Sequence, residues 1–537
     1  MKWAWIILAV AIFNAVALGQ EIGNTSKPDV TKPGSAEWAA SQNSIGNTLK
    51  EQATSVEGPD TARLFSEAAA AYRRALQVFT RDSMPQDWAT TQHSLGYVLQ
   101  EQAVRTNGPE AARLLSDAVA AYKQALQVRT REQLPLHWAM TQNDLGNALQ
   151  AQGVRAEGAE ARRVLAEAAA AYDSALLVFT REFLPRQWAM TQHNLGSALH
   201  EQATRTDGPD GVKLLDHAMA AYRQALLVRT REQMPQGWAI TQNSLGNSLQ
   251  AQATRADKPE SVRFLNEAIA AYRQSLLVFT REQTPRLWAM TKHNVGSALQ
   301  EQGMRAAGTE AQRLFGEAVA AYREALLVWN RQQLPQQWAM AQNNLARAYY
   351  NLKEWKSAAE SYENVLAVHP DFRPAYERAG FLEHEVLFNY ERTFKLNESW
   401  LKRNPDDLAA LAGLAETYFT TGNFDECARR ISAVLSDARF DAKTKISLRA
   451  LEIANLIALN KSAEVPAKLK NLIEAVESQP PDLKLQRSFV GIEHFIDAQP
   501  QFTASKPWLL QFFAAISGEN REAIISSLRK AAESFAN

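Results

Sequence analysis

The chain has 537 residues, in which 58 Lys and Arg balance 58 Asp and Glu and 46% of the residues are hydrophobic. This composition excludes disordered and collagen-like proteins, and the zero formal charge removes the usual electrostatic basis for binding nucleic acid or an anionic membrane. The single cysteine, Cys427, excludes an intramolecular disulfide and the paired thiolates of a structural zinc site.

The first 19 residues are typical of a secretory signal peptide. Met1 and Lys2 precede an apolar run that ends at Leu18 and is interrupted only by Asn14. Because the run is shorter than the ~20 residues that a membrane-spanning helix needs, we predict cleavage near Gly19. The mature chain is then exported, periplasmic or secreted, and has no membrane span. The alternative is an uncleaved signal that anchors the chain.

A tryptophan followed by alanine recurs every 50 residues without one insertion, at Trp38, Trp88, Trp138, Trp188, Trp238, Trp288 and Trp338. In the unit that begins at Trp138, Leu145 and Leu149 follow at spacings of seven and four, which places the three residues on one helical face. Apolar residues recur at spacings of three and four again between Ala111 and Ala125. Each unit therefore reads as a pair of amphipathic helices, the second of about 25 residues.

The positions of proline and glycine in each unit agree with this interpretation. A proline such as Pro135 stands just before the first helix of the next unit, where a first helical turn tolerates it. Glycine marks the turn between the two helices, as at Gly108, and Glu110 then supplies the negative charge that suits a helix N-terminus. No period-two alternation indicates strands.

From Leu345 the unit shortens, and its sequence resembles the tetratricopeptide repeat. The residues that carry the resemblance are Leu345, Ala346, Tyr349, Ala358, Tyr362 and Pro370. The 50-residue units fit the same template with both helices lengthened. The resemblance implies an all-α fold, a right-handed superhelical solenoid of antiparallel helix pairs. One departure is the tryptophan, which stands seven residues before the Leu-Gly pair instead of three, so we expect it to staple the start of the first helix.

The predicted organisation follows from these repeats. A signal peptide at 1–19 and an extended leader at 20–37 precede six long repeats at 38–337; ordinary and degenerate repeats follow at 338–440, and a helical capping region at 441–537. In the degenerate part, Cys427 stands where Ala358 stands in the ordinary repeat. We therefore expect Cys427 to be a buried packing residue and not a reactive thiol.

Asparagine and histidine alternate at one position of the first helices. The candidate binding residues are Asn43, Asn47, His93, Asn143, Asn147, His193, Asn243, Asn247, His293 and Asn343. In tetratricopeptide superhelices the first helices line a concave groove, and the resemblance implies that these residues face it. An asparagine amide both donates and accepts, so a ladder of amides suits the backbone of an extended peptide, as in some members of that family.

The alternative interpretation is that this face is polar only because water touches it, with the histidines solvated at the surface. Duplication of a 100-residue double unit would copy neutral residues as well, and the alternation of Phe79, Arg129, Phe179, Arg229 and Phe279 supports such duplication. His193 and His200, seven residues apart, are placed to pair with each other on one helix. The three histidines of alternate units lie ~30 Å apart and do not share a metal.

The sequence contains no nucleophile motif and no phosphate-binding glycine loop. We therefore predict no cofactor and a non-enzymatic scaffold that binds a peptide or protein partner, not nucleic acid, outside the cytoplasm. Two alternative functions belong to other classes of protein. One is a structural array that associates with itself as a homo-oligomer. The other is an enzyme with an unrecognised site in residues 441–537, where Glu493 and His494 are the candidate residues.

Overall fold

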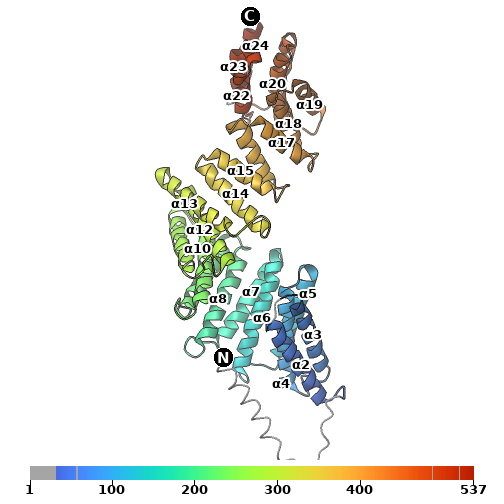
Figure 1. Ribbon diagram of the computed structural model, residues 1–537, viewed down its shortest axis with the longest axis vertical. Coiled ribbons are helices and arrows are strands. Elements are labelled where there is room, and N and C mark those ends of the chain that lie inside the picture. The colour runs from blue at the N-terminus through green and yellow to red at the C-terminus, as the bar shows by residue number, and fades with distance from the viewer. Residues whose placement is uncertain (1–31, 56–57, 486–487, 519, 537) are drawn as a thin grey trace, which may run out of the picture. The chain divides into compact units, whose positions relative to one another are not determined.

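A computed structural model describes residues 32–55, 58–485, 488–518 and 520–536. The predicted signal peptide and most of the predicted leader lie outside these residues. The chain divides into two compact units, an N-terminal unit up to Arg255 and a C-terminal unit from Ala256. Throughout the described residues the regular structure is helical (Figure 1), which confirms the predicted all-α class.

The N-terminal unit consists of helix pairs that follow the 50-residue period. Its first helices are α2 (Ala36–Ser55), α4 (Pro85–Val104), α6 (Pro135–Arg155), α8 (Pro185–Ala203) and α10 (Pro235–Ala253). Its second helices are α3 (Pro59–Ala75), α5 (Gly108–Ala125), α7 (Gly158–Leu176) and α9 (Gly208–Leu226). Each of α2, α4, α6 and α8 packs on the second helix of its own repeat, and that helix packs on the next first helix, as α6, α7 and α8 do in Figure 1. This successive packing is that of a helical solenoid.

Close packing within each pair depends on the glycine of the Leu-Gly dipeptide. A Cβ atom at Gly146 would lie 2.6 Å from Cε1 of Tyr172, which is fully buried on the second helix of the same repeat. The equivalent glycines Gly46, Gly96 and Gly196 meet their own tyrosines in the same way. The glycine therefore permits close helix approach, as this dipeptide is expected to do in such repeats.

The second helix is shorter than the sequence pattern predicted. Helix α5 has 18 residues and ends at Ala125, with its Pro at the start as expected. The N–H of Arg129 returns to the carbonyl of Ala125 at 3.0 Å, and a turn then leads to α6, which begins at Pro135. Partly buried side chains continue through this turn at nearly helical spacing, which is why the apolar pattern overestimated the helix length.

The C-terminal unit continues the pairs with α11 (Lys258–Ser275), α12 (Pro285–Arg305), α13 (Gly308–Leu326), α14 (Pro335–Asn351) and α15 (Trp355–Leu366). The degenerate region contains α16 (Arg373–Phe381), a π-helix (Leu382–Val386), α17 (Tyr390–Leu401), α18 (Leu408–Thr420) and α19 (Phe424–Ser436). The C-terminal region contains α20 (Ala442–Ala458), α21 (Val465–Glu477), α22 (Val490–Ala498), α23 (Lys506–Ile516) and α24 (Arg521–Ala536), with short 3-10 turns at Ser462–Glu464 and Pro500–Phe502.

One hydrophobic core joins the last repeat helices to the C-terminal region, and its buried members extend from Ala412 to Ala531. Cys427 is part of this core and is fully buried, and burial raises the pKa of its thiol. Its packing role is therefore confirmed. Among the described helices, none combines the length and the apolar character that crossing a membrane requires.

Candidate functional site

The candidate asparagines lie on first helices, where their amide oxygens hold neighbouring helices together. Asn143 is 4% exposed, and its Oδ1 accepts a hydrogen bond of 3.0 Å from Thr191 Oγ1 of the next repeat. Asn43 Oδ1 accepts in the same way from Thr91. One turn further along, Asn147 Oδ1 accepts from the hydroxyl of Tyr172 at 2.8 Å.

The same oxygen of Asn147 accepts from Asn194 Nδ2 at 3.1 Å, and Asn47 Oδ1 accepts from Tyr72 OH at 2.8 Å. Asn243 is buried, whereas Asn247 and Asn343 are partly exposed. The structure gives the Nδ2 groups of Asn47 and Asn147 no hydrogen-bond partner within the described residues. Asn47 and Asn147 therefore offer Nδ2 donors while their oxygens are engaged inside the array, whereas the Nδ2 group of buried Asn143 donates to Asp144 Oδ1.

The histidines of the ladder are not solvated, in contrast to the simpler interpretation of the sequence. Nδ1 of His93 lies 3.3 Å from Thr141 Oγ1, and Nδ1 of His193 lies 3.2 Å from Thr241 Oγ1. His293 is 7% exposed, and its Nε2 lies 3.0 Å from Asn344 Nδ2. Burial lowers the pKa of His93 and His193 to about 3 and that of His293 to about 4, so all three are neutral at physiological pH.

His193 and His200 do not pair with each other, so the local pairing that the sequence left open as the less favoured possibility is not formed. His200 Nδ1 lies 2.9 Å from Ser248 Oγ, while His193 contacts Thr241. Both side chains therefore bridge to the next repeat. Because the bridged positions differ by 48 residues in each case, the two histidines make parallel contacts along the array and not a joint site.

The alternation of His and Asn is coupled to the alternation of Arg and Phe in the second half of the repeat. Arg229 is 8% exposed, and its Nη1 donates at 2.9 Å to Thr241 Oγ1, the atom that His193 also contacts. Where Asn143 stands in place of the histidine, Phe179 stands in place of the arginine and is buried in an apolar cluster. The interface between repeats is therefore built in two ways, one with a histidine and an arginine and the other with an asparagine and a phenylalanine.

One repeat carries an additional, partly buried carboxyl group. Asp144 Oδ2 lies 3.5 Å from His93 Nε2, and Asp144 Oδ1 accepts from Asn143 Nδ2 at 3.2 Å. Burial raises the pKa of Asp144 to about 6, against the opposing effects of Asn143 and of the positive charge of Arg129. The equivalent position in the next repeat is Asn194, so the acid is specific to one repeat.

Three of the five first helices in the N-terminal unit also expose a large apolar side chain two residues after the tryptophan, where α2 and α4 carry Ala40 and Thr90. In the N-terminal unit these side chains are Met140, Met190 and Ile240, with exposed fractions of 44%, 41% and 40%. Met140 and Asn147 stand at i and i+7 and therefore share one helical face, whereas Asn143 between them is buried against the next repeat. The exposed face of these helices thus combines apolar and amide groups. In the C-terminal unit Met290 and Met340 occupy the same position.

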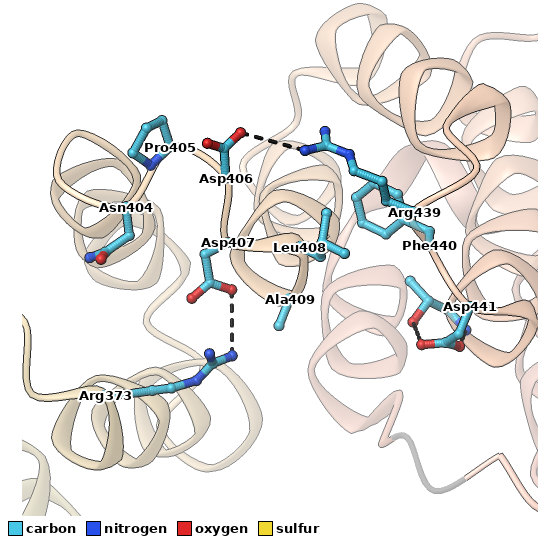
Figure 2. Close-up of a pocket in the computed structure, with 11 residues that line it drawn as sticks. Arg373, Asn404, Pro405, Asp406, Asp407, Leu408, Ala409, Arg439, Phe440 and Asp441 are labelled. Carbon is cyan, nitrogen blue, oxygen red and sulfur yellow. Dashed lines mark hydrogen bonds and ion pairs between the residues drawn. The ribbon is translucent and has the colours of Figure 1, made fainter.

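A cavity of about 740 Å³ opens between the starts of α18 and α20 (Figure 2). Figure 2 shows Arg373 directed at Asp407 and Arg439 directed at Asp406, each pair at 3.5 Å. Asp407 also accepts from the backbone N–H of Ala410 at the start of α18. Two of the three aspartates that line the cavity are therefore paired with an arginine, and the third, Asp441, accepts from the backbone N–H of Thr444 at 2.8 Å.

The residues proposed for an enzyme in the C-terminal region lie in a different arrangement. His494 stacks on Phe388 with ring centroids 3.6 Å apart, and its Nδ1 lies 3.0 Å from Tyr390 OH. Glu493 has its pKa raised by burial and by the charge of Glu385. The structure thus gives His494 contacts with the ring of Phe388 and with the ring and the phenol hydroxyl of Tyr390. Within the described residues, no three His, Cys, Asp or Glu side chains are arranged to hold a metal ion.

Comparison with known proteins identifies one repeat. A family model described as tetratricopeptide repeat matches residues 338–369, which form α14 and α15 and contain Leu345, Tyr349 and Tyr362. The search of curated proteins found no match. The C-terminal part of a TPR repeat-containing protein from Cytophaga hutchinsonii is similar over 64% of this chain and 99% of its own, with 10% identity and a TM-score of 0.37. Residues 1–338 of the assembly chaperone of RpL4 (Acl4) are similar over 55% of this chain and 98% of their own, with 16% identity and a TM-score of 0.36.

Proposed function

We propose that this chain, which is a tetratricopeptide-type repeat protein, is a non-enzymatic scaffold that binds an extended segment of a partner protein along its first helices, outside the cytoplasm. Such repeats suggest a protein-interaction role. The site is the groove that the family resemblance implies for the first helices. The partner is a protein because the chain has no net charge to attract nucleic acid.

The observation that carries the proposal is the repeated surface of the first helices in the N-terminal unit. Met140 and Asn147 share the exposed face of α6, and Met190 occupies the equivalent position on α8. Methionine side chains are flexible and polarisable, so a row of them adapts to different apolar partners. Exposed apolar side chains that recur in one row are more typical of an interaction surface than scattered ones.

The amide groups define the chemistry of the bound segment. Because the oxygens of Asn43, Asn47 and Asn147 already accept hydrogen bonds, their free capacity is the Nδ2 donor. Donors of this kind bind the backbone carbonyl groups of an extended peptide, and the methionine row takes its apolar side chains. We therefore propose that these asparagines bind only the backbone carbonyl groups of the peptide and not its N–H groups. Because every residue has a backbone carbonyl, this binding is independent of the peptide's sequence.

Export is the second part of the proposal and is supported by the apolar run that ends at Leu18. The test is to express the full chain with a C-terminal tag, fractionate the cells and measure the intact mass of the purified protein. Cleavage near Gly19 and recovery outside the cytoplasm are expected. An uncleaved chain in the cytoplasm would contradict export, and an uncleaved chain in the membrane fraction would indicate the anchored form.

The scaffold is tested by capture of envelope proteins on the immobilised mature chain. The variant Asn143→Ala/Asn147→Ala/Asn243→Ala is expected to lose most of the captured protein. A matched control is Thr191→Val, which breaks the same contact between repeats but retains the Asn143 amide. Equal capture by the folded triple variant and the wild type would contradict the amide ladder, and equal loss in Thr191→Val would show that only packing is involved. Size-exclusion chromatography of the same samples reveals self-association.

A further inference from the structure

A second pocket in the C-terminal unit contains charged groups of one sign only. It has a volume of about 400 Å³ and lies where the end of α12 meets α14, α15 and the start of α16. Its charged side chains are Arg347 and Arg378, and no carboxyl group of the described residues lines it. Asn343, a binding residue that the sequence predicted, lines the same pocket. We call it the arginine pocket.

The two guanidinium groups of this pocket have no ion-pair partner. No Asp or Glu in the described part of the chain pairs with Arg347 or Arg378. Glu377, the neighbour of Arg378 in the chain, accepts instead from Arg373 Nε at 2.7 Å. The guanidinium of Arg378 lies 5.5 Å from the ring centre of Tyr350, a contact that orients the group but gives its N–H donors no acceptor. The pocket therefore holds two positive charges that no carboxylate of the described residues compensates.

The hydroxyl of Tyr362 is a further donor of the pocket. In a long repeat the equivalent hydroxyl, that of Tyr172, lies 2.8 Å from Asn147 Oδ1 and 2.9 Å from Gln150 Oε1. In the ordinary repeat, Arg347 and a tyrosine stand in place of these two acceptors. Tyr362 is 4% exposed, and the structure gives its hydroxyl no hydrogen-bond partner within the described residues. A nearly buried donor of this kind requires an acceptor from outside the chain.

Both guanidinium charges act on this hydroxyl. Burial raises the pKa of Tyr362, and the positive charges of Arg378 and Arg347 oppose that shift. The two charges therefore lie close enough to act on the same point of the pocket. An oxyanion at this point would accept hydrogen bonds from the guanidinium groups and from the phenol, and charge-assisted hydrogen bonds of this kind are strong.

The rest of the lining is mostly apolar. Met304 and Phe372 have exposed fractions of 50% and 39%, and Tyr350 and Pro374 line the pocket beside them. A bare inorganic ion would leave these side chains in contact with water, whereas an organic group attached to the anion would cover them. The lining therefore favours an anion that carries an apolar group.

We propose that the arginine pocket binds an organic phosphate monoester, with Arg347, Arg378 and the hydroxyl of Tyr362 donating to the phosphate. The apolar group of the ligand lies against Met304 and Phe372. A phosphate monoester carries a charge of about −1.5 to −2 at pH 7 and three acceptor oxygens, so it balances two guanidinium groups, whereas a carboxylate carries a single charge. This ligand site goes beyond the scaffold function and does not depend on it.

The test uses the full mature chain and three probes, phenyl phosphate, phenylacetate and inorganic phosphate. Dissociation constants are measured by isothermal titration calorimetry at pH 7.5. Phenyl phosphate should bind at least about tenfold more tightly than phenylacetate, which has one charge and two oxygens. It should bind about fivefold more tightly than inorganic phosphate, which has no apolar group. Absence of phenyl phosphate binding, or equal binding of phenyl phosphate and either of the other probes, would overturn the proposal.

Variants identify the pocket. Arg347→Asn introduces the residue that Asn147 is in a long repeat, so it fits the fold, and it should weaken phenyl phosphate at least about tenfold. Arg378→Gln should have a similar effect, and Tyr362→Phe should weaken binding about threefold. The matched control is Arg281→Gln, at an exposed arginine that does not line the pocket, and it should leave binding unchanged. Unchanged binding in folded Arg347→Asn or Arg378→Gln would overturn the proposal.

The outcome also separates the pocket from the scaffold function. Binding of phenyl phosphate that depends on Arg347, without capture of any protein by the immobilised chain, would support the pocket and contradict the scaffold. Capture that depends on Asn143, together with no binding of phenyl phosphate, would support the scaffold and overturn the pocket.

Discussion

Thr191 Oγ1 donates a hydrogen bond of 3.0 Å to Asn143 Oδ1 of the preceding repeat. One repeat further, the equivalent Thr241 accepts from Arg229 at 2.9 Å and lies 3.2 Å from His193. The threonine is thus a donor to asparagine in one interface and an acceptor from arginine in the next. The two hydrogen-bond patterns thus alternate with the same 100-residue double period as the sequence.

The two patterns predict coupling between His193 and Arg229. We expect the double variant His193→Asn/Arg229→Phe, which reproduces the combination of Asn143 and Phe179, to be more stable than the sum of the single variants implies. Residues that share a partner couple by about 0.5–3 kcal/mol. Urea unfolding of the four proteins of the cycle at pH 7 measures the coupling. Additive effects within ~0.5 kcal/mol would contradict it.

Buried His293 predicts loss of stability in acid. Burial lowers its pKa to about 4, while in the unfolded chain it titrates near 6.5. As the pH falls from 6.5 to 4, the unfolded state gains a proton that the folded state does not, so this contribution to stability is lost. The free energy of unfolding of His293→Asn should therefore increase relative to that of the wild type as the pH falls. The relative increase should be about 3 kcal/mol at most near pH 4. Urea unfolding at pH 7, 5.5 and 4.5 measures this gain, and a difference that does not vary with pH would contradict the assignment.

The raised pKa of Asp144 predicts the opposite dependence of folding stability on pH. Burial raises its pKa to about 6, so between pH 4 and pH 6 the folded state holds a proton that the unfolded state has released. This contribution to stability is present at low pH and is lost as the pH rises through 6. Because the side chain is 27% exposed, solvent screening reduces the effect, and we expect Asp144→Asn to stabilise the chain by about 1–2 kcal/mol at pH 7.

The measurement is the difference in unfolding free energy between Asp144→Asn and the wild type at pH 4 and pH 7. The difference should be smaller at pH 4. Asn194 and Asn344 occupy the same position in other repeats, so the substitution fits the fold. An effect of equal size at both pH values would show that folding does not raise the pKa of Asp144.

The contact between Gly146 and Tyr172 predicts that even one methyl group is costly. Gly146→Ala should destabilise the chain by about 1–3 kcal/mol, because overpacking against a buried ring outweighs the gain in helix propensity. The matched control is Gly316→Ala, where the added Cβ meets open space and the propensity gain should remain. Thermal unfolding followed by circular dichroism compares the two. Equal stability of both variants would contradict close packing at Gly146.

The repeat architecture predicts that a whole double unit is dispensable. Deletion of residues 138–237 joins His137 to Trp238 in register and should leave a shorter array that unfolds cooperatively. Deletion of residues 138–212, one and a half repeats, is the matched control and should lose helical content. Far-ultraviolet circular dichroism and urea unfolding measure both properties. Loss of cooperative unfolding in the in-register deletion would count against independent repeats.

The sequence by itself determined the repeat, the helix pairs and the packing role of Cys427. These three features depend on local periodicity and on residue size, and the same pattern is repeated in six duplicated units. The Trp-Ala period located the first helices. Gly108 marked the start of a second helix, and Pro135 marked the start of the next first helix. The length of the second helix was overestimated because the turn after Ala125 keeps partly buried side chains at a nearly helical spacing.

Only the tertiary structure decided what the alternating polar residues contact. Asn143 and His193 have the same position in their helices, but their partners, Thr191 and Thr241, are 48 residues away and are reached only when one repeat packs on the next. Periodicity determines which face of a helix a residue occupies, whereas hydrogen-bond partners, burial and pKa values depend on distances between helices.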